Sequence, residues 1–383
     1  MSVNLDAVIA GGGPAGCALA ILLAQQGCAV KLIESSSHAQ NKMCGEFYSD
    51  EAVQYLNALD VDLRSLGALP ITAVRLAREH VIAECALPFA GLSLPRRIAD
   101  EALLQRACAA GVQVLRAQRI EGLQQSNGRW VARCSDGREH VADQAFLATG
   151  KHDLRGWKRG AGKQNDLVAF KMYFALSPRQ ADALKRYVEL ILFPDGYAGL
   201  QMVEPGIANL TLVIRQSAFR RCGAGWDGVL SHITRHSAHL RARLTGAEAL
   251  LEKPLALSSI PYGYQRPVSH DSAWCVGDQC AVIPSFTGDG MAIALHSAHV
   301  AAEQFLSGHT SSEFHGAFAR QMHGPIQMAT LFSRLMLEAP MLAYGLRLYP
   351  RAMAWIAHGT RVPKRFLMLS PVRPLHAFSG ETP

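Results

Sequence analysis

A glycine-rich turn near the amino terminus constrains the fold of this chain more than any other feature. The apolar run Asp6–Ala10 leads into the turn, which consists of Gly11, Gly12, Gly13, Pro14, Ala15 and Gly16. An Ala- and Leu-rich stretch without a helix breaker continues to Gln26, and a second apolar run, Ala29–Ile33, follows Gly27. This order predicts a β-α-β unit with parallel strands and a right-handed crossover.

Each glycine of the turn has its own task in such a unit. Gly11 permits the tight turn off the strand, Gly13 lets the backbone approach a pyrophosphate, and Gly16 lets the helix pack closely on the strand. The helix that starts at Pro14 and Ala15 presents free N–H groups and its positive dipole end to phosphates. Glu34, at the end of the second strand, can accept hydrogen bonds from a ribose. The sequence therefore predicts a dinucleotide site here.

A second glycine- and acid-containing segment follows much later in the chain. Gly277 and Asp278 end an apolar run, and a strand-end carboxylate beside a crevice can bind a polyol. The next segment contains Pro284, Gly288, Asp289, Gly290 and Met291. Its glycines open a predicted helix, whose positive end can stabilise negative charge on a reduced flavin. The glycine turn alone does not distinguish NAD from FAD, but two distant segments suit an extended dinucleotide held at both ends. We therefore predict FAD.

Together these motifs resemble the FAD-dependent oxidoreductases of the para-hydroxybenzoate hydroxylase and geranylgeranyl reductase type. The resemblance extends from residue 6 to about residue 310. It implies that the first turn and Glu34 bind the ADP half of FAD, that Asp278 binds the ribityl chain, and that residues 284–291 lie along the flavin ring and pyrophosphate. It also implies a cofactor contact from Arg96, which precedes Asp100 by four positions as in the family.

A third motif is similar to one found in geranylgeranyl reductases. Lys42, Cys44, Gly45 and Ser49 match the K-x-C-G-x-x-x-S segment of that group. The resemblance implies that Cys44 and Gly45 lie beside the reactive face of the flavin, with Glu46 close by. We take Cys44 and Glu46 as the candidate catalytic residues. The alternative for Cys44 is a buried thiol that behaves as a small apolar side chain, which is usual for a free cysteine.

Other stretches depart from the family patterns. The Asp-Gly motif by which the hydroxylases touch both FAD and NADPH is replaced by the basic stretch that begins Lys151-His152-Asp153. The aromatic motif of the geranylgeranyl reductases is missing from Tyr197–Val203, and the W-x-W-x-I-P motif of the flavin-dependent halogenases is missing as well. These departures leave the docking of NAD(P)H open, weaken the case for polyprenyl reduction and disfavour halogenation.

The pattern of apolar runs predicts an α/β fold in which a Rossmann-like FAD-binding domain carries an inserted antiparallel sheet. A helix is expected over 99–110, a strand over 112–115, a hairpin around Asp136-Gly137, and a buried strand over 144–150. Four strands, 167–176, 188–193, 197–203 and 208–214, should form an antiparallel meander. The FAD-binding parts are expected at 1–75, 96–160 and 271–325, strands of the substrate domain at 76–95, the substrate-binding sheet domain at 161–270, and a helical C-terminal segment at 326–383.

Composition limits the class of protein further. The nine cysteines form no C-x-x-C pair, which argues against a disulfide framework or a zinc site, and we expect no bound metal. His296 and His299 have metal-pair spacing but no third partner, and we treat them as ordinary helix residues. The sequence starts without a signal peptide pattern, so we expect a cytoplasmic protein. Tyr197, Tyr262 and Tyr264 could line a substrate pocket or pack within the sheet.

The net charge of +7 is concentrated near the C-terminus. From Ile326 onward there are seven basic and two acidic residues, together with apolar stretches that prolines and charges interrupt before they could span a bilayer. The more common arrangement for such a segment is amphipathic helices packed on the body. The alternative is a surface that contacts a membrane or an acyl-carrier protein. We expect no nucleic-acid partner.

The leading functional hypothesis is a flavoprotein monooxygenase of secondary metabolism. NAD(P)H would supply electrons to FAD, and O2 would oxidise an apolar or aromatic small molecule held under the meander. The main alternative is a C=C reductase or dehydrogenase similar to geranylgeranyl reductase, which the Cys44 segment favours. A third hypothesis is a flavin-containing binding or electron-relay protein, which the altered stretch at Lys151 leaves open.

Overall fold

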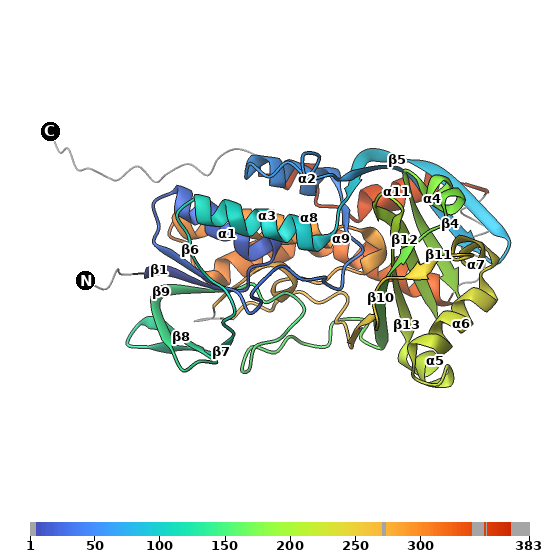
Figure 1. The fold of residues 1–383 in the computed structure, drawn as a ribbon. Helices are drawn as coiled ribbons and strands as arrows, with labels where there is room; N and C mark the ends of the chain where they lie inside the picture. Colours follow the sequence, from blue (N-terminus) through green and yellow to red (C-terminus); the bar gives the residue numbers. More distant parts are fainter. Residues whose placement is uncertain (1–4, 270–272, 339–347, 350, 369–383) are drawn as a thin grey trace.

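The structure is a computed structural model that describes residues 5–269, 273–338, 348–349 and 351–368. Two β-sheets dominate it, one at each end of the elongated molecule (Figure 1). Part of the C-terminal segment, residues 339–347, 350 and 369–383, lies outside the described residues. In the described part of the chain, no helix is both long and apolar enough to cross a membrane.

The first sheet has the strand order β6-β2-β1-β9-β8-β7, with β16 also paired to β9. Its central strands β6, β2, β1, β9 and β16 are parallel, whereas β8 and β7 are antiparallel. Its strands are β1 (Leu5–Ala10), β2 (Val30–Ile33), β6 (Gln113–Leu115), β7 (Ile120–Ser126), β8 (Arg129–Cys134), β9 (Glu139–Leu147) and β16 (Trp274–Cys275). The parallel β1–β2 pair confirms the predicted β-α-β unit.

The second sheet has the order β14-β10-β13-β12-β11-β4-β5-β3, with β15 paired to β10. Its strands are β3 (Phe47–Tyr48), β4 (Leu69–Arg78), β5 (Val81–Ser93), β10 (Leu167–Ala175), β11 (Tyr187–Phe193), β12 (Gly196–Glu204), β13 (Ile207–Arg215), β14 (Glu248–Ala249) and β15 (Leu255–Ser258). Most side chains of β10 are buried, because both faces of this sheet are covered.

Helices cover both sheets. They are α1 (Pro14–Gln25), α2 (Asp50–Ala58), α3 (Arg96–Ala109), α4 (Pro178–Leu184), α5 (Gln216–Arg221), α6 (Trp226–His236), α7 (Ala238–Arg243), α8 (Gly290–Leu306), α9 (Ser311–Glu338) and α11 (Arg351–Gly359). Short 3-10 turns are η1 (Gly277–Gln279), η2 (Ser285–Thr287) and η3 (Lys364–Phe366). Helix α1 is buried almost all round, as expected for an apolar helix between a sheet and its neighbours α3 and α8.

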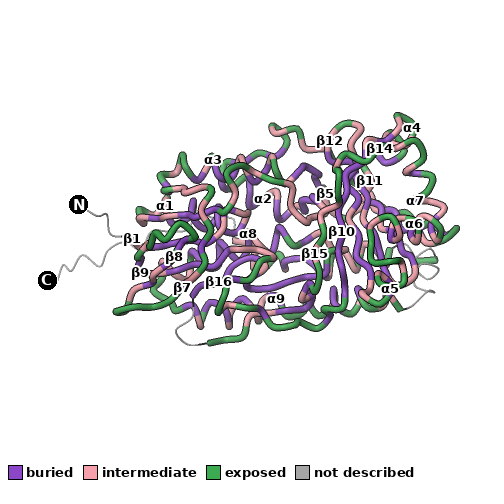
Figure 2. Tube along the Cα trace, turned by 60° about the horizontal axis from the view of Figure 1, so that its bottom comes forward, coloured by how far each residue is buried: buried purple, intermediate pink, exposed green. Residues whose placement is uncertain are grey.

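The core consists of layers on the faces of the two sheets. One apolar cluster joins the first sheet to α1, α3 and α8, and another joins the outer face of the second sheet to helices α4–α7. A third lies on the inner face of the second sheet and includes side chains from α9 and α11. In Figure 2 the strands of both sheets are mostly buried, whereas parts of α5 and the β7–β8 hairpin are exposed.

Several predicted elements need correction. The strands expected at 139–143 and 144–150 are one continuous strand, β9, because its alternating half pairs with β8 and its apolar half enters the sheet beside β1. The meander holds only for β11, β12 and β13, since β10 pairs with β13 and β11 pairs in parallel with β4. The helix expected over 225–244 is broken at Ser237, whose hydroxyl accepts from the N–H of Leu240 and caps α7. Strand β7 and helix α2 were not predicted.

The expected domain limits stay a prediction, and the strands do not follow them strictly. β4 begins at Leu69 and β3 at Phe47, both inside the stretch assigned to the first FAD-binding part. Helix α9 begins at Ser311, before the expected C-terminal segment. The chain therefore passes between the two sheets more often than the apolar pattern indicates.

Candidate active site

One cavity of about 1200 Å³ connects the glycine turn of the first sheet with the inner face of the second sheet. It brings together most of the residues that the sequence singled out. Those that line it are Gly11, Gly13, Pro14, Ala15, Glu34, Lys42, Cys44, Gly45, Glu46, Arg96, Gly277, Asp278, Gly288, Gly290 and Met291. Segments from three distant parts of the sequence thus meet at one cavity.

Three predicted cofactor contacts do not line this cavity: Gly16, Pro284 and Asp289. The carboxylate of Asp289 accepts hydrogen bonds from the Ser49 hydroxyl (3.0 Å) and the Val362 N–H (3.1 Å). Burial raises the pKa of Asp289 to about 6, although the Arg361 guanidinium opposes the shift. Asp289 therefore joins the start of α8 to α2 and to the C-terminal segment within the protein interior.

The glycine turn has the shape that a pyrophosphate cradle requires. Gly11 has φ +108°, and a Cβ there would lie 2.5 Å from the carbonyl oxygen of Ala148. A Cβ on Gly16 would lie 1.9 Å from the carbonyl oxygen of Gly11, so the close approach of α1 to β1 requires glycine. A Cβ on Gly13 would meet only the Arg96 guanidinium, at 3.9 Å. Gly13 thus leaves open space in front of the first turn of α1, which fits a bound pyrophosphate.

Glu34 is held at the end of β2 in an ionised state. Its carboxylate accepts from the backbone N–H of Gly12 at 2.7 Å and from that of Ser36 at 2.9 Å. Burial alone would raise the pKa of Glu34, but these backbone hydrogen bonds and the Lys42 charge lower it. An ionised carboxylate beside the glycine turn can accept hydrogen bonds from a ribose.

Asp278 faces the cavity beside the basic stretch that replaces the family's Asp-Gly motif. The Lys151 ammonium lies 2.9 Å from its carboxylate, and Arg159 donates to its backbone carbonyl at 3.2 Å. Burial opposes ionisation of Asp278, but Lys151 and Arg159 outweigh it and lower the pKa. The departure at Lys151 therefore adds a cation next to the predicted ribityl-binding carboxylate.

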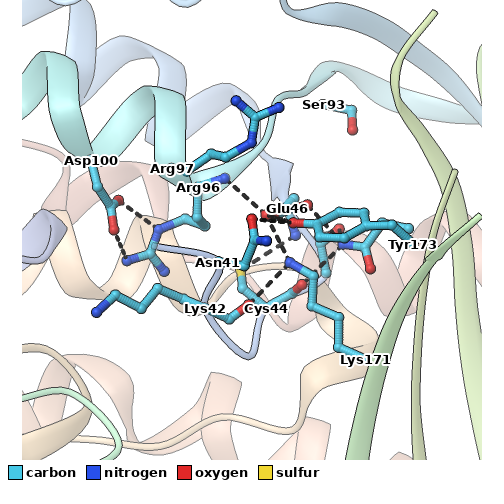
Figure 3. A network of polar contacts seen from close by, with 12 residues as sticks. Asn41, Lys42, Cys44, Glu46, Ser93, Arg96, Arg97, Asp100, Lys171 and Tyr173 are labelled. Atoms are coloured by element: carbon cyan, nitrogen blue, oxygen red, sulfur yellow. Dashed lines mark hydrogen bonds and ion pairs between the residues drawn. The ribbon is translucent and has the colours of Figure 1, made fainter. Parts of the chain in front are cut away.

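The Cys44 segment is fastened to the second sheet by a buried polar network (Figure 3). The Lys171 ammonium, on β10, lies 2.7 Å from the Glu46 carboxylate and donates to the carbonyl of Lys42 at 3.0 Å. The Tyr173 hydroxyl donates to the same carboxylate at 2.7 Å. On β13, the Asn209 amide donates to the carbonyls of Cys44 and Gly45 and to Glu46, each at 3.0 Å.

This network assigns Glu46 a positioning role in place of the predicted catalytic one. Its side chain is fully buried, and its carboxylate also accepts from the Arg96 N–H at 2.8 Å. Burial lowers the pKa of Lys171, and the nearby Glu46 opposes that shift. Glu46 has φ +65°, a left-handed conformation that costs a non-glycine residue about 1–3 kcal/mol. Its several partners hold that conformation, and the loop presents Cys44 to the cavity.

Arg96 begins α3 and faces the glycine turn. Its guanidinium makes two hydrogen bonds to Asp100, at 2.6 and 2.7 Å, as the four-residue spacing allows within a helix (Figure 3). Burial alone would lower the pKa of Arg96, but Asp100 raises it well above its usual value. Arg96 is therefore a fixed cation about 4 Å from the position of a Gly13 side chain.

The cavity continues into an apolar arm under the second sheet. Its walls there include Leu76, Leu190, Val213, Leu257 and Met336. Three hydroxyl-bearing residues interrupt this apolar wall, and they are Tyr197, Tyr262 and Ser285. The Tyr197 and Ser285 hydroxyls lie 3.2 Å apart, and burial raises the pKa of both tyrosines. Tyr264, the third candidate, does not line the cavity.

Sequence analysis missed several residues that shape the site. Lys171 and Asn209 look like single polar interruptions of apolar strands, and such a buried polar side chain is the signal that could have found them. His296 and His299 are buried on α8, where His296 contacts the Tyr55 hydroxyl at 2.8 Å and His299 contacts the carbonyl of Leu295 at 2.9 Å. Within the described residues, His, Cys, Asp and Glu side chains do not form a group that could hold a metal ion.

Comparison with known proteins agrees with this geometry. Residues 4–145 match the family model described as the FAD binding domain. The chain belongs to the FAD-dependent oxidoreductase superfamily of the para-hydroxybenzoate hydroxylase and geranylgeranyl reductase type. It is thus a FAD-binding protein of an enzyme superfamily, which confirms the fold class and cofactor predicted from the sequence.

Individual relatives are distant. The menaquinone reductase of Mycolicibacterium smegmatis is 25% identical over 335 residues, which cover 80% of this chain and 78% of that protein. The flavin-dependent brominase Bmp2 has a similar structure, with TM-score 0.77, 18% identity and 96% of each chain covered. A flavoprotein/dehydrogenase from Cytophaga hutchinsonii has TM-score 0.73 and 16% identity, covering 88% of this chain and 86% of its own.

Proposed function

We propose that this protein is a FAD-dependent monooxygenase that takes electrons from NAD(P)H and uses O2 to oxidise an apolar or aromatic small molecule. The observation that carries the proposal is the single cavity that joins the glycine turn to the apolar arm. Its volume of about 1200 Å³ exceeds the roughly 300–1,000 Å³ typical of a site for one small ligand. The cavity can therefore hold FAD together with a second molecule.

The residues of this chain provide different environments at the two ends of that cavity. Gly13, Glu34, Arg96 and Asp278 form the polar end, where they would hold the phosphates and hydroxyl groups of FAD. Bound FAD would supply the electron transfer from NAD(P)H and the activation of O2. The apolar arm would exclude water from the reacting atoms, which suppresses loss of activated oxygen to side reactions.

Orientation of the substrate falls to the few polar groups of the apolar arm. Tyr197 and Tyr262 stay protonated because burial raises the pKa of each hydroxyl. Together with Ser285 they can donate and accept hydrogen bonds with a hydroxyl or carbonyl oxygen of the substrate. Ser285 opens the η2 turn that leads to Gly288, so a group held here lies beside the segment proposed to follow the flavin ring.

A reductase is the second candidate, and a specific observation favours it. The Cys44 segment, whose pattern is similar to that of geranylgeranyl reductases, lines the cavity with its thiol half-buried. The relatives with the broadest coverage in sequence are described as menaquinone reductases. In this reaction the reduced cofactor would give a hydride to an unsaturated substrate, and the proton would come from a nearby acid such as the thiol of Cys44.

One experiment separates the two reactions. The FAD-loaded protein is reduced with NADPH or NADH in the absence of oxygen, O2 is then admitted, and the visible spectrum is followed. The monooxygenase proposal expects rapid reduction, then an oxygen-dependent transient spectrum distinct from the oxidised and reduced forms, and one atom of labelled O2 in the product of an aromatic substrate. Reduced protein that is stable to O2 and reoxidised by an alkene or quinone favours the reductase. If neither dinucleotide reduces the flavin, both enzyme proposals lose their electron donor.

A further inference from the structure

Helices α9 and α11 form the wall at the far end of the apolar arm. Phe332 and Met336 of α9, and Met353 and Ile356 of α11, line the cavity. Met336 and Met353 belong to one buried cluster that also contains Tyr197 of the second sheet. Only the inner faces of these two helices are used in this way, so the helix pair lies between the arm and the surface.

The outer face of α11 has a different character. Arg351, Trp355 and His358 are exposed and follow the i, i+4, i+7 spacing that puts them on one side of the helix. Trp355 is 61% exposed, and just before α11 Leu348 is 75% and Tyr349 is 73% exposed. A large aromatic or aliphatic side chain left open to solvent is unremarkable alone, but several around one helix mark a contact surface.

The neighbouring helix α9 extends this surface. Gly359 of α11 packs against Met328 of α9, and the shared cluster of Met336 and Met353 shows that the two helices run antiparallel. Leu331 lies one turn from that contact on α9, as Trp355 does on α11, and it is 57% exposed. The two side chains therefore stand on adjacent turns of the helix pair.

Basic side chains accompany the apolar ones. Arg334, Arg351, Lys364 and Arg365 are exposed on or beside α9 and α11. The nearby acid Glu338 is paired with Arg215 at 2.7 Å, so it does not cancel their charge. Exposed Trp and Leu side chains flanked by Lys and Arg are the features of a helix that lies in the interface of an anionic membrane.

We propose that this α9–α11 face, made by Leu331, Leu348, Tyr349, Trp355, Arg351 and Lys364, docks onto a bilayer that contains anionic lipids. An acidic carrier protein would match the charge, but it gives no reason for four large apolar side chains to be exposed together. The location adds a consequence that rests on the proposed function. An apolar substrate dissolved in the bilayer would enter the apolar arm beside α11, without crossing water.

Vesicle binding of the FAD-loaded protein tests the docking without any turnover. Vesicles of equal parts phosphatidylcholine and phosphatidylglycerol are compared with vesicles of phosphatidylcholine alone in a sedimentation assay. We expect binding to the anionic vesicles only. The double variant Arg351→Gln/Lys364→Gln should bind about 25-fold more weakly, from about fivefold for each basic residue near such a surface. Trp355→Ser should weaken binding about tenfold or more.

Matched controls come from the opposite face of the second sheet. Arg220→Gln on α5 removes an exposed charge there, and Leu250→Ser removes an exposed apolar side chain next to β14. Both variants should bind like the parent. Lipids brominated in their acyl chains should quench tryptophan fluorescence in the parent and in Trp226→Phe, but not in Trp355→Phe.

Three results would overturn the docking proposal: equal binding to neutral and anionic vesicles, equal losses in the control variants, or quenching that persists in Trp355→Phe. Saturable binding of an acyl-carrier protein that is lost in the Arg351→Gln/Lys364→Gln variant, without binding to vesicles, would assign the face to that partner instead. Each of these outcomes leaves the NAD(P)H and O2 experiment unaffected, so failure of the docking is distinguishable from failure of the proposed reaction.

Discussion

At the scale of single residues, Gly13 offers the most direct test of the cofactor site. Its φ of −80° is available to any residue, and the protein leaves open space where its side chain would stand. Gly13→Val should therefore fold normally but fill the space in front of α1 that we assign to the pyrophosphate. We expect FAD affinity to fall at least about tenfold, as in other overpacked sites, measured by flavin fluorescence titration. Gly324→Ala, where a Cβ meets nothing within 4 Å, should keep the parental affinity.

Lys171 tests the claim that Glu46 positions the Cys44 loop. Lys171→Met would leave the fully buried Glu46 carboxylate without its cation, which costs about 3–5 kcal/mol of unfolding free energy in comparable buried pairs. The double variant Glu46→Gln/Lys171→Met should recover part of that loss, because no unpaired charge remains. Denaturant unfolding measures both values. Lys185→Met, which alters an exposed lysine just before β11, should change stability little. A single variant as stable as the parent would mean that the ion pair does not hold the loop.

At the scale of elements, local patterns predicted the FAD-binding unit well. The β1-α1-β2 unit depends on a contiguous glycine turn, an unbroken apolar helix and two short apolar strands, and all of this information lies in some thirty residues. Strand pairing over long range was harder. Nothing in Leu167–Ala175 indicates that β10 pairs with β13 and not with β11, since both alternatives bury the same side chains.

The candidate site shows the same division. The residues in recognisable motifs, such as Gly13, Glu34 and Asp278, do meet at one cavity. Asp289 has equally typical spacing, but its carboxylate turns inward to Ser49 and Val362, a choice made by tertiary packing. Lys171 and Asn209 could not be assigned from the sequence, because their partners lie on a loop more than 100 positions away in the chain.

The buried histidines of α8 and α9 predict how stability changes with pH. Burial lowers the pKa of His296, His299 and His315 to about 4 each. The unfolded chain would protonate them near pH 6.5, so between pH 6.5 and 4 it binds more protons than the folded protein. Stability should therefore fall on acidification through this window, by up to about 3 kcal/mol per histidine at its lower end.

Unfolding free energies measured from pH 7 to pH 4.5 check this expectation. His299→Leu should reduce the slope, because its imidazole makes only a contact with the Leu295 carbonyl of the same helix. His323→Leu alters an exposed histidine on α9 and should leave the slope unchanged. Asp289 acts in the opposite sense. Its pKa of about 6 means that the folded state holds the extra proton between about pH 4 and 6, so this group favours stability at lower pH. An absent net acid loss would show that Asp289 and similar groups outweigh the histidines.

At the scale of the whole molecule, the cavity lies between two sheets with separate apolar cores. A dinucleotide bound there would touch the glycine turn, the loop that carries Cys44 and the start of α8, and the Lys171–Glu46 pair would extend the coupling to β10. We therefore expect FAD to stabilise both sheets together. Ligand at 100 times its dissociation constant adds about 2.7 kcal/mol.

Hydrogen exchange with and without FAD measures where that stabilisation appears. If the cofactor lies as proposed, exchange should slow in residues 11–16, 41–46 and 284–291, and also in β10 and β13, whose side chains hold the Cys44 loop. The exposed β7–β8 hairpin supplies an internal control, because its turn at residues 126–129 lines no part of the cavity. Protection confined to residues 11–16 would mean that only the ADP half is gripped firmly and that the second sheet responds to substrate alone. In Lys171→Met the protection of β10 should disappear while that of the glycine turn remains, since the ion pair is the physical link between the two sheets at this point.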